Sequence, residues 1–227
     1  MRFSIVIPTW EQYGKGVFFL NQLLTSIRNQ NYQSLEVIIS DHSINNDIEN
    51  LTNNFTDLFI RYFRNENNRG NSPANLNFGL NHAEGDIIKV MFQDDFFVNN
   101  NSLILIDNAF TNKDAKWLVN GCCHTTDSVN FYNFMVPSWN DRILEGINTI
   151  SSPSVLSFIN SEIIFFDENL TMLMDCDYYT KMKNKFGVPS VLEDITVVNR
   201  TWGNRLTDTT PQELKNKEFE MLKLRYA

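Results

Sequence analysis

Long apolar runs are missing from this 227-residue sequence, and cysteine, glycine and proline are scarce. No apolar run approaches the roughly 20 residues that cross a bilayer, and the strand-like start Arg2–Pro8 lacks the layout of a signal peptide. Nine glycines and six prolines, beside 18 phenylalanines, exclude collagen, coiled coil and general disorder. Three cysteines, two of them adjacent, form neither a disulfide framework nor a zinc spacing. One globular domain in a reducing, cytoplasmic setting is therefore expected.

Basic residues are also few: 19 Lys and Arg stand against 27 Asp and Glu, which gives a net charge of −8. Binding to a nucleic-acid duplex needs a basic face, so nucleic acid is excluded as the main partner. A nucleotide is still compatible with this charge, because a metal ion and backbone N–H groups can meet its few phosphate charges.

The first half of the chain alternates strand patterns with helical patterns. Short apolar runs predict buried strands at 4–7, 36–40, 58–63 and 87–92, with Pro8 ending the first. Leucines and an isoleucine at i, i+3, i+4 and i+7 predict a helix over 20–27, and a second helix is expected at 71–83. Such alternation indicates a parallel sheet with helices on both faces, whose ligands bind beyond the carboxyl ends of the strands.

The second half is less regular. Its patterns predict helices and strands in the order helix 102–110, strand 117–121, strand 131–136, helix 175–186 and strand 191–198. A last helix is expected to start with Thr210 as N-cap, Pro211 at the first helical position and Glu213 three residues after the cap. No repeat, flexible linker or block of like charge divides the chain.

Polar residues follow the first two predicted strands. Thr9 and Glu11 come after the first, and Asp41 and Ser43 after the second. A carboxylate at the end of a buried strand costs free energy unless it is hydrogen-bonded, so Asp41 could accept a nucleobase N–H while Thr9 binds the base or ribose. The alternative is that Asp41 or Ser43 only caps the next helix.

Two adjacent carboxylates, Asp94 and Asp95, follow the fourth strand. Oxygen ligands of this kind suit Mg²⁺ or Mn²⁺, and such ions usually bridge to substrate phosphates. The alternative is a solvated turn in which Asp95 caps a helix.

Two further carboxylates, Asp175 and Asp177, open a predicted helix after an apolar run. A general base needs a carboxylate partly shielded from water, which this position would supply. The alternative is an ordinary acidic partner of the helix dipole. Arg69, in a Gly-punctuated polar loop, could meet a phosphate or simply be solvated.

Several of these segments together, in their order along the chain, carry a family resemblance. They are Ser4-Ile5-Val6-Ile7-Pro8-Thr9, Ser40-Asp41-His42-Ser43, Asn68-Arg69-Gly70, Asn77-Phe78-Gly79, Gln93-Asp94-Asp95 and Phe166-Asp167-Glu168-Asn169-Leu170. From residue 3 to about residue 207 the chain resembles the family-2 glycosyltransferases of the GT-A fold. The resemblance implies a single α/β domain with a mostly parallel, Rossmann-like sheet flanked by helices. Residues 1–98 would form the nucleotide-sugar-binding half, 99–210 the acceptor-binding half and 211–227 a C-terminal helix.

The resemblance also implies roles for individual residues. Asp95 would ligate a divalent ion, Mn²⁺ or Mg²⁺, and Asp94 would contact the ribose or the ion. Asp175 would be the catalytic base, with Asp177 as the alternative, because the usual Glu of that motif is absent. The remaining expected nucleotide ligands are Pro8, Thr9, Glu11, Asp41 as the reader of uracil, Ser43, Arg69 and Asn77. Trp202 stands where the family has a His that can complete the metal site.

The implied reaction is inverting transfer of a sugar from a nucleotide diphosphate sugar, with UDP favoured, to the hydroxyl of a glycan or other acceptor in surface polysaccharide or glycan synthesis. Peripheral association with the inner face of a membrane is compatible with this role. Two alternatives stay open. A nucleotidyltransferase should carry a basic, Gly-rich phosphate loop near its first strand, and a non-catalytic sugar-nucleotide-binding protein would bind but not turn over its ligand.

Overall fold

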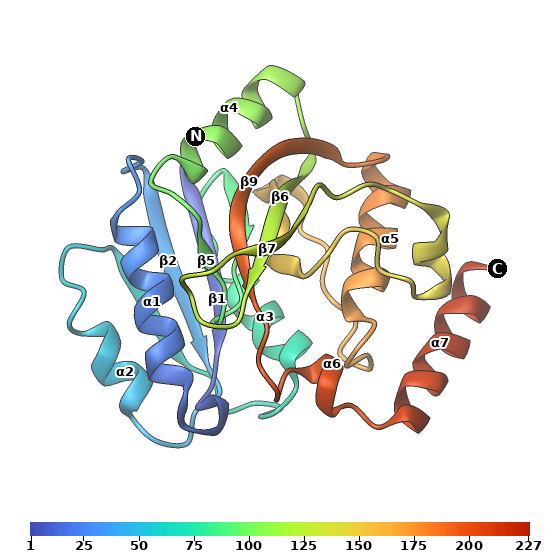
Figure 1. Cartoon of the computed structure of the whole chain (residues 1–227), viewed down its shortest axis with the longest axis horizontal. Coiled ribbons are helices and arrows are strands. Elements are labelled where there is room, and N and C mark those ends of the chain that lie inside the picture. The colour runs from blue at the N-terminus through green and yellow to red at the C-terminus, as the bar shows by residue number, and fades with distance from the viewer.

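Four parallel strands form one half of a continuous nine-stranded sheet (Figure 1). The computed structural model describes all 227 residues. The four strands lie in the order β3-β2-β1-β4 and have the bounds β1 (Phe3–Thr9), β2 (Leu35–Asp41), β3 (Ile60–Arg64) and β4 (Ile87–Val90). They confirm the four predicted strands, because strands covered on both faces are apolar at nearly every position.

The second half of the sheet is mixed in direction. Beyond β4 the order continues β8-β6-β9-β5, with β7 paired to β6. β6 and β9 are parallel, whereas β8, β5 and β7 run antiparallel to their neighbours. The bounds of these strands are β5 (Phe96–Phe97), β6 (Trp117–Thr125), β7 (Tyr132–Met135), β8 (Leu156–Ile159) and β9 (Ser190–Arg200). The sheet is thus mostly parallel, as predicted.

The first strand does not end at Pro8 as predicted. β1 continues to Thr9, and Pro8 pairs in register with Ser40 of β2. On its other side, β1 pairs with β4 only as far as Val6. The missing N–H of Pro8 therefore points to a side where β1 has no partner strand, and no ladder hydrogen bond is lost.

Helices flank both halves of the sheet. Figure 1 shows α1 and α2 beside the parallel strands at the left, and α5 and α7 at the right. The apolar i, i+3, i+4, i+7 face of α1 is buried, as its spacing predicts. The helices are α1 (Gly16–Arg28), α2 (Asp47–Thr52), α3 (Ser72–Leu80), α4 (Ser102–Lys113), α5 (Met174–Phe186), α6 (Leu206–Thr209) and α7 (Gln212–Tyr226). Short 3₁₀ turns lie at Gln12–Gly14, Asp141–Glu145, Pro153–Val155 and Asn160–Glu162.

The predicted C-terminal helix exists as α7, but its predicted cap does not. The hydroxyl of Thr210 donates back to the carbonyl of Leu206, at 2.6 Å, so it closes the short helix α6 instead. α7 then begins at Gln212, directly after Pro211, with no side-chain cap. The sequence pattern hid α6, because four residues are too few to show helical periodicity.

One hydrophobic core joins all parts of the chain. Ile5 and Val37 from the parallel strands lie in the same buried cluster as Phe158 of β8, Tyr178 of α5 and Leu222 of α7. The chain is therefore a single domain, and its core does not divide at the predicted boundary between residues 98 and 99. None of its helices combines the length and apolar character needed to cross a bilayer.

A buried carboxylate attaches α7 to the rest of the domain. Glu218 is fully buried and accepts the backbone N–H groups of Thr171, Met172 and Leu173 at 2.8–2.9 Å. These three residues lead directly into α5. The position at which α5 begins, and hence that of Asp175, depends on this contact.

We expect Glu218→Ala to lower the free energy of unfolding by about 2–3 kcal/mol, because it leaves three backbone N–H groups without their charged acceptor. Glu220→Ala is the matched control, since the side chain of Glu220 is exposed and pairs with Lys223 on the surface. Urea unfolding of both variants measures the difference. Equal midpoints would show that the three hydrogen bonds to Glu218 do not stabilise the fold.

Candidate functional site

The loops that follow β1, β2 and β4 meet at the edge of the sheet where these strands end. β1 and β2 stay in register up to Thr9 and Asp41. Gln93, after β4, accepts the N–H of Trp10 at 3.0 Å and donates to the carbonyl of Gly16 at 2.8 Å. A side chain at position 16 would prevent this, because its Cβ would lie 2.4 Å from the carbonyl oxygen of Trp10. The predicted ligand segments therefore lie side by side.

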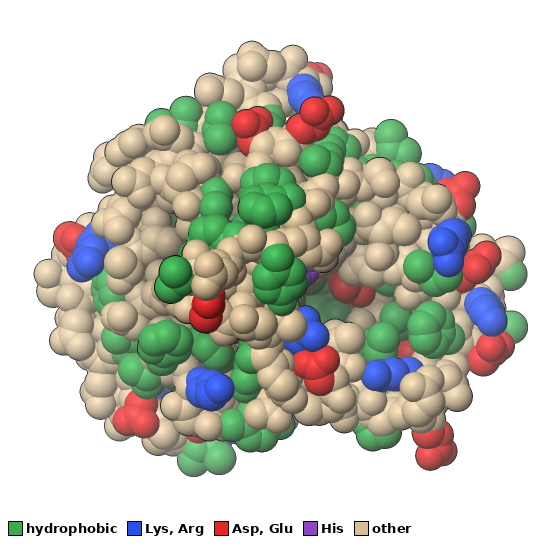
Figure 2. Space-filling model, in the orientation of Figure 1, with side chains coloured by type: hydrophobic (Ala, Val, Ile, Leu, Met, Phe, Trp, Pro, Cys, Tyr) green, Lys and Arg blue, Asp and Glu red, His purple; other side chains and the backbone are tan.

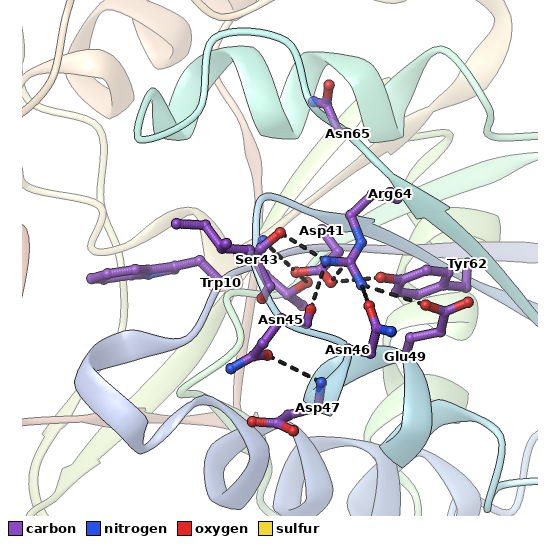
Figure 3. A network of polar contacts seen from close by, with 12 residues as sticks. Trp10, Asp41, Ser43, Asn45, Asn46, Asp47, Glu49, Tyr62, Arg64 and Asn65 are labelled. Carbon is purple, nitrogen blue, oxygen red and sulfur yellow. Dashed lines mark hydrogen bonds and ion pairs between the residues drawn. The ribbon is translucent and has the colours of Figure 1, made fainter.

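Asp41 is fully buried, and both oxygens of its carboxylate have donors (Figure 3). Oδ1 accepts the hydroxyl of Thr9 at 3.1 Å and the N–H of Ser43 at 2.9 Å. Oδ2 accepts the hydroxyl of Tyr62 at 2.7 Å and lies 3.8 Å from Nε of Arg64. Burial, reinforced by the hydrogen bond to Asp41, raises the pKa of Tyr62 well above its usual value, so the phenol stays a donor. Asp41 is a fixed, fully bonded acceptor.

The loop after β2 is fixed by Arg64. Its guanidinium donates to the carbonyls of Ser43 at 2.8 Å and Asn45 at 2.6 Å, and to the side chain of Asn46 at 3.1 Å (Figure 3). α2 begins only at Asp47, with Asn46 as its N-cap, so neither Asp41 nor Ser43 caps it. Sequence reasoning missed Arg64. The available signal was an arginine at the end of a strand adjacent to that of Asp41.

Three more of the predicted nucleotide ligands lie around this loop. Pro8 is next to Thr9 in β1. Glu11 accepts the backbone N–H of Ile44 and so joins the loop after β1 to the loop after β2. The hydroxyl oxygen of Ser43 is buried and has no hydrogen-bond partner in the protein. The structure thus brings these residues together, and it leaves one polar atom among them unused.

Two other predicted nucleotide ligands, Arg69 and Asn77, are engaged in contacts with residues outside the loops after β1 and β2. Arg69 is on the surface and pairs with Glu66 at 3.3 Å. The amide of Asn77 bonds both the N–H and the carbonyl of Phe166, at 2.9 Å each, and also donates to Glu168 at 3.0 Å. With both amide hydrogens and the carbonyl used, Asn77 holds the 166–168 segment against α3. Its predicted role as a nucleotide ligand stays a prediction, and the structure adds this structural role.

The acidic pair Asp94 and Asp95 lies against the end of β9. Asp94 accepts the indole N–H of Trp202 at 2.8 Å, and Asp95 accepts the backbone N–H of Arg200 at 2.9 Å. Burial, and then the charge of Asp94, raises the pKa of Asp95 to about 7. Burial also raises the pKa of Asp94. Two neighbouring carboxylates are therefore held where their negative charges are poorly compensated.

A divalent cation fits this pair of carboxylates. Hard oxygen donors suit Mg²⁺ or Mn²⁺, and a cation would relieve the repulsion that raises the pKa of Asp95. The chain has no group of three or more His, Cys, Asp or Glu side chains arranged to hold a metal ion, so a cation held here would have at most these two carboxylates as charged protein ligands. Trp202 cannot replace the expected His as a ligand, because an indole N–H only donates.

Asp175 lies in the first turn of α5 and is partly buried. Burial raises the pKa of its carboxyl group to about 6, although the N–H of Cys176 at 2.7 Å and the amide of Asn148 at 2.6 Å favour the charged form. Only three carboxyl groups of the chain have a clearly raised pKa, and they are Asp94, Asp95 and Asp175. Perturbed titrations of this kind concentrate at functional sites.

Asp177 points to the opposite side of α5. Its carboxylate is fully buried, lies 2.7 Å from Nζ of Lys181, and accepts hydrogen bonds from Arg225 and from the hydroxyl of Tyr226. These contacts tie α5 to α7. The structure thus gives Asp177 a role in docking the C-terminal helix and separates it from Asp175.

A buried lysine beneath the acidic pair was also missed. Lys89 in β4 is fully buried, and its ammonium donates to the side chain of Asn120 and to the carbonyl of Ser154. Burial lowers its pKa to about 7. The hydroxyl of Ser154 in turn accepts the N–H of Phe92, in the segment between β4 and Asp94. The signal was a charged residue inside the apolar run 87–92.

The N-terminal half of the sequence matches a known protein family. Residues 4–121, just over half of the chain, match the model of the family described as glycosyl transferase family 2. The chain belongs to this family. The family segment contains the loops after β1, β2 and β4, and it ends within β6, so it includes Asp41, Asp94 and Asp95 but not Asp175.

Curated relatives of this family-2 chain match it over its N-terminal part. A GalNAc(5)-diNAcBac-PP-undecaprenol beta-1,3-glucosyltransferase of Campylobacter jejuni is 30% identical over 96 residues, which are 41% of the chain and 30% of that protein. An uncharacterized glycosyltransferase of Haemophilus influenzae is 36% identical over 98 residues, which are 42% of the chain and 37% of that protein. The chain thus aligns with about a third of the length of these relatives.

Solved structures match nearly the whole chain. S. aureus TarS, residues 1–349, superposes with a TM-score of 0.71 and 20% identity, over 88% of this chain and 60% of that one. A complex of the same protein with UDP superposes with a TM-score of 0.71 and 18% identity, over 89% of this chain and 61% of that one. The mannosyltransferase PcManGT of Pyrobaculum calidifontis, in complex with GDP-Man and Mn²⁺, superposes with a TM-score of 0.62 and 18% identity, over 87% of this chain and 56% of that one. The fold of this family-2 chain is the GT-A fold.

We expect Arg64→Met to weaken UDP binding about tenfold, or about 1.4 kcal/mol, because the loop after β2 loses the donors that fix its carbonyls. Calorimetry with UDP measures the change. Arg28→Met is the matched control, since the guanidinium of Arg28 is largely exposed and pairs with Asp57 at 4.0 Å, away from this loop. Equal affinities of the two variants would show that the loop keeps its shape without Arg64.

Proposed function

We propose that this family-2 chain transfers a sugar from a UDP-sugar to an acceptor hydroxyl, with inversion at the anomeric carbon. One observation carries the proposal. A single edge of the sheet combines a fixed loop around a buried acceptor, an acidic pair with poorly compensated charge, and a carboxylate whose pKa is about 6. These are the three parts that a nucleotide-sugar transferase needs, in order: a base reader, a diphosphate site and a proton acceptor.

The nucleotide would bind at the loops after β1 and β2. Asp41 supplies a fixed acceptor for a base N–H, beside Thr9 and the unpartnered hydroxyl of Ser43. Reading a base N–H through Asp41 requires that one of its present donors shares the carboxylate or withdraws. Glu11 and Pro8 shape the neighbouring loop. UDP bound to a structural neighbour supports uridine as the nucleoside.

The diphosphate would lie against the acidic pair. Asp95, with Asp94, would hold Mn²⁺ or Mg²⁺. Such an ion neutralises the negative charge that develops on a leaving diphosphate. In the protein itself, the N–H of Arg200 and the indole of Trp202 hold the two carboxylates in place. The Mn²⁺ complex of a structural neighbour supports this assignment.

Asp175 would act as the general base. With a pKa near 6, its carboxyl group is ionised at neutral pH, yet it is a stronger base than an exposed carboxylate. It would take the proton of the acceptor hydroxyl as the oxygen attacks the anomeric carbon from the face opposite the leaving diphosphate. The bond to the diphosphate then breaks as the new glycosidic bond forms. Asp177, committed to Arg225 and Tyr226, would not take part.

We further propose a glycan acceptor in cell-surface polysaccharide synthesis, bound by residues 99–210, with the nucleotide sugar bound by residues 1–98. The support is the Campylobacter relative, whose name describes a lipid-linked oligosaccharide acceptor. An acceptor of that kind would bring the protein to the inner face of a membrane from the cytoplasm. Membership of family 2 argues against the nucleotidyltransferase alternative.

UDP binding should depend on a divalent cation. We expect chelation, or Asp95→Ala, to weaken binding of UDP in the presence of Mn²⁺ at least tenfold, or about 1.4 kcal/mol, measured by calorimetry. Asp57→Ala, which removes an exposed carboxylate, is the control. Equal affinity of Asp95→Ala and the wild type contradicts the metal assignment. ADP is the second ligand in this experiment, and an affinity equal to that of UDP contradicts base reading by Asp41.

Asp175→Asn should lower turnover of the nucleotide sugar by roughly 10²–10⁴-fold while UDP affinity changes little, because the amide keeps the shape but cannot accept the proton. For the wild type, the rate should fall about tenfold per pH unit below about pH 6, where Asp175 becomes protonated, and level off above about pH 7. Release of free UDP from UDP-sugars measures both effects.

Asp177→Asn is the informative control for this experiment. It should lower stability, because Arg225 and Lys181 lose their buried partner, but it should keep most of the turnover per folded molecule. An inactive Asp177→Asn beside an active Asp175→Asn would transfer the role of base to Asp177. Full activity of both variants would contradict a role for either carboxylate as the base, whereas absence of turnover by the wild type would favour a non-catalytic binding protein.

A further inference from the structure

One five-residue turn, Asn148–Ser152, connects the proposed base to the acidic pair. At its start, Nδ2 of Asn148 donates to Oδ2 of Asp175 at 2.6 Å. At its end, the hydroxyl of Ser152 contacts Oδ2 of Asp95 at 3.4 Å. The two carboxylates lie 80 positions apart in the sequence, yet this turn is in contact with both of them.

The turn has an unfavourable backbone. Ser151 has a φ of +109°, a region that residues with a side chain rarely adopt. A conformation of this kind persists only when its surroundings determine it, and it concentrates at functional sites. Neither a glycine nor a proline relieves the strain at this position, so neighbouring side chains must hold the turn.

Asn148 and Asn199 hold the turn from two sides. Oδ1 of Asn148 accepts the N–H groups of Ile150 and Ser151, at 2.9 Å each, while its Nδ2 also donates to the carbonyl of Ser151 at 2.9 Å. Asn199 of β9 donates to the hydroxyl of Ser151 and accepts that of Ser152, at 3.0 Å each. One amide, that of Asn148, therefore both builds the turn and contacts Asp175.

We propose that Asn148 is a positioning residue for the transfer reaction. It sets the orientation of the Asp175 carboxylate, stabilises its charged form, and fixes its distance from Asp95 through the strained turn. This inference rests on the proposed function of Asp175 as the base. The neutral amide is suited to the task, because it donates to the carboxylate without the charge that would abolish its basicity.

The other groups that face Asp175 are neutral as well. They are the thiol of Cys176 and the phenol of Tyr179, both on α5, and burial raises the pKa of each well above its usual value. The hydroxyl of Tyr179 also donates to the carbonyl of Ser151 at 3.1 Å, which joins α5 to the same turn. From the loop packed against α5, Asn148 is the group that donates to the carboxylate.

Two substitutions separate the two tasks of Asn148. Asn148→Ala removes both the turn acceptor and the donor to Asp175. Asn148→Asp keeps an oxygen that can accept the N–H groups of Ile150 and Ser151, but replaces the donor with a negative charge. Asn169→Ala is the matched control, because Asn169 also donates to an aspartate, Asp167, at 2.8 Å, on an exposed turn.

The measurement is the pH profile of kcat/KM for UDP-sugar turnover, together with kcat, KM and thermal unfolding. We expect both Asn148 variants to move the acid limb of the profile upward, by about one pH unit for Asn148→Ala and further for Asn148→Asp, because the charged form of Asp175 loses its donor. We expect kcat to fall about 10–100-fold with KM for the nucleotide sugar within about twofold of the wild type. The Asn169→Ala profile should match the wild type.

A third variant distinguishes loss of the donor to Asp175 from a purely structural effect of losing the turn. Asn148→Ala with Ser151→Gly lets the backbone adopt the positive φ without strain, so the turn can form without the amide. We expect it to regain thermal stability but not the wild-type pH limb. Recovery of both, or an unshifted limb in Asn148→Asp, would overturn the proposal. Full activity of Asp175→Asn would instead refute the base assignment itself, so the two failures are distinguishable.

Discussion

The candidate site depends on the interactions of one buried side chain, the guanidinium of Arg200. It is 5% exposed, lies over the rings of Phe18, Phe19 and Phe96, and donates to the carbonyl of Asp94 at 3.0 Å and to Ser128 at 2.7 Å. One cation therefore connects α1, the β6–β7 turn, the end of β9 and the acidic pair. A cation so placed gains from aromatic faces and from charge-assisted hydrogen bonds that water would otherwise supply.

The buried carboxylates of this acidic chain fall into two groups, which differ in how well hydrogen bonds and cations compensate their charge. Glu36 is bonded by Ser4, Arg2 and Arg61, Glu218 by three backbone N–H groups, and Asp177 by two cations. Asp94, Asp95 and Asp175 are less well compensated, and their pKa values are raised. A raised pKa, and not acidity as such, therefore distinguishes the three carboxylates to which the proposed function assigns the metal and the proton.

Local sequence patterns were sufficient for every strand except the short β5 and β8, for most helices, and for the edge of the sheet where the candidate residues lie. Apolar runs and periodically spaced leucines involve residues that are close together in the sequence, so they can be recognised without a structure. The choice between Asp175 and Asp177 was not visible, because it depends on Asn148 and on Arg225, 27 and 48 residues away. The contact of Asn77 with Phe166 was equally hidden, since Phe166 lies 89 residues further along the chain. Motif order identified the candidate residues, and their distant hydrogen-bond partners became visible only in the structure.

The contact of Glu218 with residues 171–173 has a consequence for the order of assembly. The contacts that shape the loop after β2, from Thr9 to Arg64, lie within the first 65 residues and can form early in a growing chain. The start of α5 is held by a helix made more than 40 residues later. Contacts between residues so far apart in the sequence form late in folding, so Asp175 would reach its final position only after the loop after β2 has formed.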